Sequence, residues 1–98
     1  MQRIIESVEC ALCHMPAERW VLRRSSDGYM YDCPACRGRY SIGHSALSRA
    51  TKGEVPPDLL PRVRQHIATG DIPRIALTAG QWQPVGIVGR QDQDEAEN

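Results

Sequence analysis

The chain has 98 residues, of which 41% are apolar, and its formal charge at pH 7 is zero. This length excludes two independent hydrophobic cores, and no stretch approaches the ~20 consecutive apolar residues that cross a bilayer. Residues 91–98 hold four acids and no base, so residues 1–90 carry twelve Lys/Arg against eight Asp/Glu, an excess far below that of a dedicated polycationic nucleic-acid binder.

Alternating patterns and turn residues predict antiparallel strands in the first half of the chain. Residues 4–8, IIESV, fit either a short strand or a helical turn. ERWVLRR at 18–24 has the alternation of a strand, SSDG at 25–28 supplies the turn residues of a hairpin, and GYMYDC at 28–33 forms the return strand. We expect a third short strand, GRYSI, at 38–42.

Two helices are expected in the middle of the chain. The periodicity of HSALSRATK at 44–52 predicts a short helix that ends at Gly53. EVPP at 54–57 is an extended break, because the residue before each proline avoids the α region. Asp58 is then a candidate N-cap for a better helix, LLPRVRQHIAT at 59–69, in which Pro61 falls in the first turn.

The last third of the chain is apolar but interrupted by Pro and Gly. Residues 72–77 and 84–89 suit edge strands, or arms that pack on the first half of the chain or on a second subunit, with a loop around 78–83 between them. Their apolar side chains exceed what a small sheet readily covers, which favours self-association into a homodimer. The acidic residues 91–98 are expected to be a disordered tail.

The strongest chemical signal is a set of four cysteines in two CxxC pairs. Nineteen residues separate the pairs, which is enough for a hairpin that returns the chain to the first pair. Two residues between ligands let both sulfurs reach one tetrahedral ion at about 2.3 Å, while backbone N–H groups of the turn donate to the thiolates. The sequence therefore predicts one structural metal ion per chain, with zinc favoured, bound by Cys10, Cys13, Cys33 and Cys36.

A metal is physically useful in this chain, because only five residues are aromatic and none is Phe. Binding of a structural zinc contributes roughly 10 kcal/mol or more of apparent folding free energy, which compensates for a thin core. Rubredoxin-like iron uses the same four thiolates and is the alternative metal. Redox chemistry is less favoured, because neither pair lies at a helix N-terminus beside a strand. His14 directly follows Cys13, and adjacent residues rarely both reach one ion.

These features resemble a zinc ribbon, in which two cysteine knuckles hold a metal at one end of a small antiparallel sheet. The resemblance covers about residues 8–42 and rests on the four cysteines, on Pro34 and on the hairpin between the pairs. It implies a metal-stapled, three-stranded antiparallel ribbon at 1–43. Together with the one or two short helices and irregular apolar segments that the residue patterns predict at 44–90, the expected fold class is small α+β. Zinc ribbons commonly have Gly just after each knuckle, whereas His14 and Arg37 occupy those places here.

Arginines form a second signal, since five of them fall within 21 residues of the predicted ribbon, near aromatic side chains. Arginine pairs with phosphate and aromatic rings stack on bases, so such a surface can contact nucleic acid or another partner. Acids in the same stretch and the demand of a small sheet for aromatic core residues explain the pattern equally well. The candidate partner surface consists of Arg19, Arg23, Arg24, Arg37, Arg39, Arg62 and Arg64.

The function that the sequence favours is a non-enzymatic, zinc-binding interaction module. Four cysteines close the coordination shell, whereas a catalytic zinc keeps an open position. A protein partner is favoured over nucleic acid, because the net charge is near zero and the tail is acidic. The alternatives are a nucleic-acid-binding accessory factor in transcription or replication and a rubredoxin-like electron carrier. The start of the chain lacks the apolar run of a secretory signal, and we expect a cytoplasmic protein.

Overall fold

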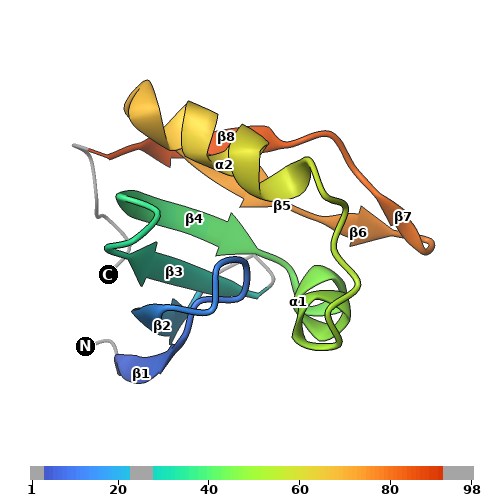
Figure 1. Ribbon diagram of the computed structural model, residues 1–98, viewed down its shortest axis with the longest axis horizontal. Helices are drawn as coiled ribbons and strands as arrows, with labels where there is room; N and C mark the ends of the chain where they lie inside the picture. The colour runs from blue at the N-terminus through green and yellow to red at the C-terminus, as the bar shows by residue number, and fades with distance from the viewer. Residues whose placement is uncertain (1–3, 23–27, 92–98) are drawn as a thin grey trace.

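The structure is a computed structural model that describes residues 4–22 and 28–91. A six-stranded sheet, a two-stranded hairpin and two helices make up these residues (Figure 1). In the large sheet the strands follow the order β1-β2-β3-β4-β5-β8, and β6 pairs with β7. The elements are β1 (Glu6–Glu9), β2 (Pro16–Val21), β3 (Tyr29–Cys33), β4 (Gly38–Ile42), α1 (His44–Thr51), α2 (Leu59–Ala68), β5 (Asp71–Ile75), β6 (Leu77–Thr78), β7 (Gln81–Trp82) and β8 (Gly86–Arg90).

The first four strands form an antiparallel meander, which contains the three predicted strands as β2, β3 and β4. The segment left open as strand or helical turn is a strand, β1, because it pairs with β2 from Glu6↔Arg19 to Glu9↔Pro16. Glu9 pairs with Pro16 beside the β1–β2 connection, and Cys33 pairs with Gly38 beside the β3–β4 connection. Because the strands are antiparallel, these two connections, which carry the cysteines, lie at the same end of the sheet. Most of the turn predicted at 25–28 falls outside the described residues.

The sheet has six strands because the last third of the chain extends it. β5 pairs in parallel with β4, and β8 pairs antiparallel with β5. The expectation of an edge strand at 72–77 was therefore wrong for β5, which lies inside the sheet. Pro73 is tolerated there because the β4 ladder starts after it, at Ser41↔Arg74, and because the register with β8 shifts between Ile72 and Pro73.

Both helices cover one face of the sheet. α1 buries Ala46, Leu47 and Ala50, and α2 buries Leu59, Val63 and Ile67. These side chains form one hydrophobic cluster with residues of the sheet, among them Tyr31, Tyr40, Ile42 and Ile75. Tyr31 and Tyr40 are register partners whose rings stack with centroids 5.2 Å apart. Two tyrosines thus supply much of the aromatic surface of a core that has no Phe.

Asp58 occupies the N-cap position of α2, as predicted, but does not cap the helix with its side chain. Its carboxylate instead accepts a hydrogen bond of 3.0 Å from Arg62 Nε, one turn along the helix. Asp58 also has αR backbone angles, whereas a side-chain cap normally needs an extended residue.

The segment at 78–83, expected to be a loop, contains the hairpin β6–β7. Ala79 (φ 53°) and Gly80 (φ 78°) form its two-residue turn, and both have the positive φ of a type I′ turn. Alanine is uncommon at such a position, which is why the sequence pattern did not predict the hairpin. None of the described helices is long and apolar enough to cross a membrane.

A single side chain joins the last described residue to the middle of the sheet. Opposite Arg39 on β4, where β5 does not pair, the Gln91 side chain accepts a hydrogen bond from the Arg39 N–H (3.4 Å) and donates to the Arg39 carbonyl (3.3 Å). It also donates to the Asp71 carbonyl at 2.9 Å. The Gln91 amide therefore takes the place of a peptide group in the ladder.

Gly28 directly precedes the strand β3 and has no room for a side chain. Its φ is 105°, and a Cβ would overlap the Ile42 carbonyl oxygen. We expect Gly28→Ala to lower the free energy of unfolding by about 3 kcal/mol or more, because backbone strain and overlap add. Gly53→Ala is the control: its φ is 77° but nothing lies within 4 Å, so the expected loss is about 1 kcal/mol. Urea unfolding of both variants with metal bound tests this, and equal losses would contradict it.

Candidate metal centre

The structure brings the four predicted cysteines together. Their sulfurs all lie within 4.8 Å of one another, and together they can hold a metal ion. The Sγ–Sγ distances are 3.6 Å for Cys13 and Cys33, 3.8 Å for Cys13 and Cys36, and 4.0 Å for Cys10 and Cys36. Four sulfurs placed tetrahedrally at about 2.3 Å from one ion are about 3.8 Å apart, so this arrangement fits a zinc-sized ion.

Two tight turns position the sulfurs, and we call them the first knuckle (residues 10–13) and the second knuckle (residues 33–36). The first connects β1 to β2 and the second connects β3 to β4. The Leu12 and Cys13 N–H groups donate to Cys10 Sγ at 3.4 and 3.5 Å, and the Cys36 N–H donates to Cys33 Sγ at 3.4 Å. These are the backbone donors that stabilise a thiolate, as the CxxC spacing predicts.

Each knuckle ends in a residue with left-handed backbone geometry. His14 has φ 66° and Arg37 has φ 72°. The same turns hold them, because the His14 N–H donates to the Cys10 carbonyl (3.0 Å) and the Arg37 N–H donates to the Cys33 carbonyl (2.9 Å). A residue with a Cβ pays roughly 1–2 kcal/mol in this region, which glycine avoids. The chain thus adopts the positive φ for which zinc ribbons commonly use glycine, without using glycine.

The sulfur cluster is continuous with the hydrophobic core. Cys10 and Cys33 are fully buried, Cys36 is 2% exposed and Cys13 is half-buried. The fully buried Tyr40 hydroxyl lies 3.1 Å from Cys10 Sγ and accepts a hydrogen bond from the Ala11 N–H at 3.2 Å. The hydroxyl keeps its proton to donate to the Cys10 sulfur, and this hydrogen bond helps to lower the pKa of Cys10. The residue that fills the core therefore also supports the first knuckle.

Arg64 is a neighbour of the cluster that the sequence did not predict in this role. It lies on α2, and its guanidinium is near enough to the Cys36 and Cys13 thiols that they raise the pKa of Arg64. Four thiolates with one Zn²⁺ carry a net charge of about −2, so an adjacent guanidinium offsets part of that charge. No spacing signal could have found this neighbour, because 27 residues separate Arg64 from the last cysteine.

The four sulfurs do not ionise independently when no metal compensates their charge. The hydrogen bond from Cys36 lowers the pKa of the Cys10 thiol and raises the pKa of Cys36, which retains the shared proton. Burial raises the pKa of the Cys33 thiol to about 11. The metal-free cluster therefore holds protons at neutral pH that a bound cation must displace.

Those of the predicted partner-surface arginines that the structure describes do not lie on one face of the sheet. Arg19 Nε is 2.7 Å from Glu6 and its guanidinium donates to the Tyr31 hydroxyl at 3.1 Å, whereas Arg39 stands over the Trp20 ring on the opposite face. Arg62 pairs with Asp58, Arg37 is exposed after the second knuckle, and Arg23 and Arg24 lie outside the described residues. His14 does not belong to the metal-holding group.

Comparison of the chain with protein-family models, with curated proteins and with solved structures gave no match in any of the three. The assignment of the four cysteines as a metal-holding group therefore rests on their geometry.

Metal affinity should increase with pH. Ligation needs four thiolates, and at pH ~6–8 at least Cys33 and Cys36 carry protons in the metal-free protein, because their pKa values are raised. Release of two or more protons makes the apparent zinc association constant rise by at least about 100-fold per pH unit over this range. Competition with a chromophoric chelator at several pH values measures the slope. An affinity independent of pH would show that zinc binding does not release protons from the thiols.

Arg64→Ala should weaken zinc binding about 10- to 100-fold, because it removes a positive charge that interacts with the Cys36 and Cys13 sulfurs. Arg64→Lys keeps the positive charge and should lose less zinc affinity than Arg64→Ala. Arg62→Ala is the matched control on the same helix, since Arg62 pairs with Asp58 and both side chains are about two-thirds exposed. The same chelator competition, with circular dichroism to verify folding, measures all three. Equal effects at 62 and 64 would exclude a specific role for Arg64.

Proposed function

We propose that the protein is a non-enzymatic, zinc-binding interaction module that presents a rigid surface to a protein partner. The observation that carries this proposal is the four-sulfur group, in which three sulfurs are buried and all four lie at the spacing of a tetrahedral shell. Four thiolates would fill that shell and leave no position for a substrate, which is the arrangement of structural sites. The ion would supply folding free energy in place of chemistry.

Zinc is the ion that we propose, and the zinc ribbon is the closest description of the first half of the chain. Thiolate ligands in tetrahedral geometry suit zinc, and iron is the alternative that elemental analysis separates from it. Two hairpins that carry one knuckle each at the same end of an antiparallel sheet support the ribbon resemblance. The added β5 and β8 extend this sheet beyond three strands.

A protein partner is proposed over nucleic acid because of how the arginines are used. Arg19, Arg39 and Arg62 each pair with a carboxylate, on Glu6, Asp32 and Asp58 respectively. Arg64 interacts electrostatically with the Cys36 and Cys13 thiols. Arginines held in this way contribute less to the counterion release that drives binding to phosphates.

A homodimer and a cytoplasmic location stay proposals. Ile72 and Ile75 on β5 are buried within the chain, whereas Ile87 and Val88 on β8 are 52% and 53% exposed. β8 is an outer strand of the sheet. Of the two apolar segments expected to join subunits, the second therefore offers the better surface.

Metal content and partner capture test the proposed function together. Elemental mass spectrometry should give one zinc per chain, and circular dichroism should show loss of structure on chelation. Zinc-loaded protein should then capture a protein whose binding, once both are purified, is lost when zinc is removed and persists after nuclease treatment. Partner binding would require the folded ribbon, so metal removal acts through the fold.

Three results would contradict the proposal in different ways. Iron in place of zinc favours the electron-carrier alternative. Capture that nuclease abolishes, together with oligonucleotide binding that weakens steeply as salt is raised, favours the nucleic-acid alternative. Normal folding and partner binding without metal would remove the structural role of the cysteines.

A further inference from the structure

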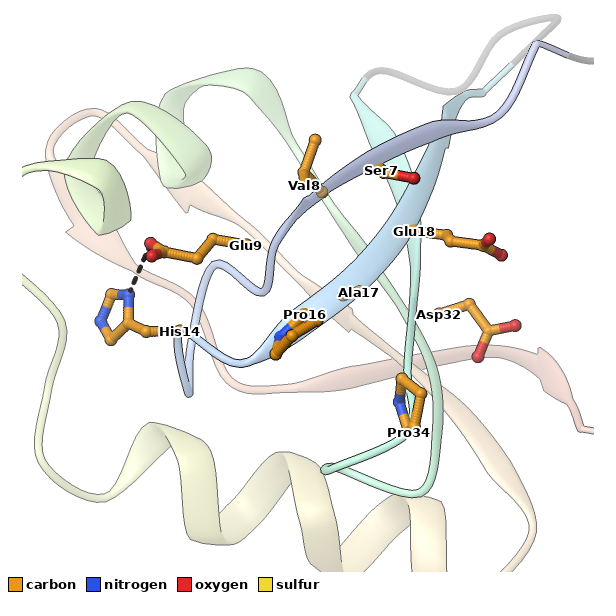
Figure 2. A pocket seen from close by; sticks show the side chains of 9 residues that line it. All are labelled: Ser7, Val8, Glu9, His14, Pro16, Ala17, Glu18, Asp32 and Pro34. Atoms are coloured by element: carbon orange, nitrogen blue, oxygen red, sulfur yellow. Dashed lines mark ion pairs between the residues drawn. The ribbon is translucent and has the colours of Figure 1, made fainter.

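A groove of about 710 Å³ crosses β1, β2 and β3 beside the two knuckles (Figure 2). Its exposed apolar lining comes from Pro16 on β2 and from Pro34 in the second knuckle. Val8 and Ala17 also border it, but they are register partners whose side chains pack against the core. This volume lies within the range of about 300–1,000 Å³ that is typical of ligand pockets. The groove can therefore accept a few residues of another chain.

Two carboxylates stand side by side in this groove. Glu18 on β2 is the register partner of Asp32 on β3, and Figure 2 shows both side chains pointing to the same side. Like charges directly opposite each other on neighbouring strands destabilise a sheet. Asp32 is 3.8 Å from Arg39 Nε, whereas no described residue forms an ion pair with Glu18. A cation from outside the chain would relieve this repulsion.

The remaining charged groups of the groove make it more acidic. Glu9 also lines it but turns toward His14, whose Nδ1 is 3.6 Å from the carboxylate (Figure 2). Neither Lys nor Arg is among the described residues that line the groove. The adjacent four-thiolate centre would add a net charge of about −2 when it holds zinc. The combined field attracts cations to this end of the sheet.

The geometry favours an organic cation over a metal ion. Among the described residues, the four cysteines are the only group of three or more His, Cys, Asp or Glu side chains arranged to hold a metal. The carboxylates of Glu9, Glu18 and Asp32 thus do not converge on one point. Two neighbouring carboxylates beside apolar walls instead match a guanidinium or ammonium group on an aliphatic stem.

We propose that this groove binds a segment of the partner protein that carries an arginine or lysine flanked by apolar residues. The cationic head lies between Glu18 and Asp32, and its stem and apolar neighbours contact the exposed prolines Pro16 and Pro34. The inference rests on the proposed function, because it names the chemistry of the partner. It predicts that binding to the groove is selective for basic over acidic segments.

Nuclear magnetic resonance of the zinc-loaded full chain tests the groove directly. The probes are a capped peptide of alternating arginine and valine and the same peptide with glutamate in place of arginine. We expect the arginine peptide to shift the amide signals of Ser7, Glu18 and Asp32 in a saturable manner, and the glutamate peptide to leave them unchanged. Glu18→Gln should weaken binding about fivefold or more. Glu54→Gln, which changes an exposed carboxylate paired with Arg49 outside the groove, should have no effect.

Each contrary result overturns the groove assignment. These results are no saturable shift with the arginine peptide, shifts that map elsewhere, an equal response to the glutamate peptide, or equal losses in the two glutamine variants. The amide spectrum of each variant shows whether it is folded, so an unfolded protein is not mistaken for lost binding. A zinc-dependent partner that binds Glu18→Gln as well as the native chain would leave the proposed function intact and remove the groove from it.

Discussion

The rest of the structure depends on the convergence of four sulfurs at one end of the sheet. The two knuckles join two successive hairpins, Tyr40 links the cluster to the core, and Arg64 links it to α2. Because four close thiolates repel one another, the arrangement needs a cation to be stable when they are ionised. Neutralising the charge of the cluster is therefore a condition for packing the core. A chain with no Phe has few other sources of stability.

Local patterns predicted the elements better than their arrangement. Alternation and turn residues indicated β2, β3 and β4, and periodicity with flanking Gly and Pro indicated α1 and α2. The position of β5 was not predictable in this way, because Pro73 is typical of an edge strand and the parallel pairing with β4 spans two helices. Such pairing depends on how helix faces meet the sheet, and a single sequence carries little local signal of it. The expected disorder of the acidic tail concerns residues outside those described.

Within the candidate site, too, local sequence patterns predicted some residues and not others. The cysteines could be selected from spacing alone, since CxxC fixes the local geometry of each knuckle. The arginines could not be grouped correctly, because nearness in sequence does not place side chains on the same face. Arg19 is the register partner of Tyr31 on the helix-covered face, whereas Arg39 pairs with Asp32 on the other face. In the sequence Glu18 and Asp32 are only two acids near arginines. The pairing of β2 with β3 makes them neighbours.

The hydrogen bonds between the Gln91 side chain and the Arg39 backbone couple the end of the chain after β8 to the strand β4. Arg39 lies in the middle of the sheet, yet its N–H donates to a side chain beyond the outer strand β8 and not to a neighbouring strand. When the end of β8 frays, Gln91 withdraws and this amide becomes open to solvent. Hydrogen exchange at Arg39 should then follow the opening of the chain end and not the global unfolding that governs its neighbours in the β3–β4 ladder. A central strand would thus contain an amide with the exchange behaviour of an edge.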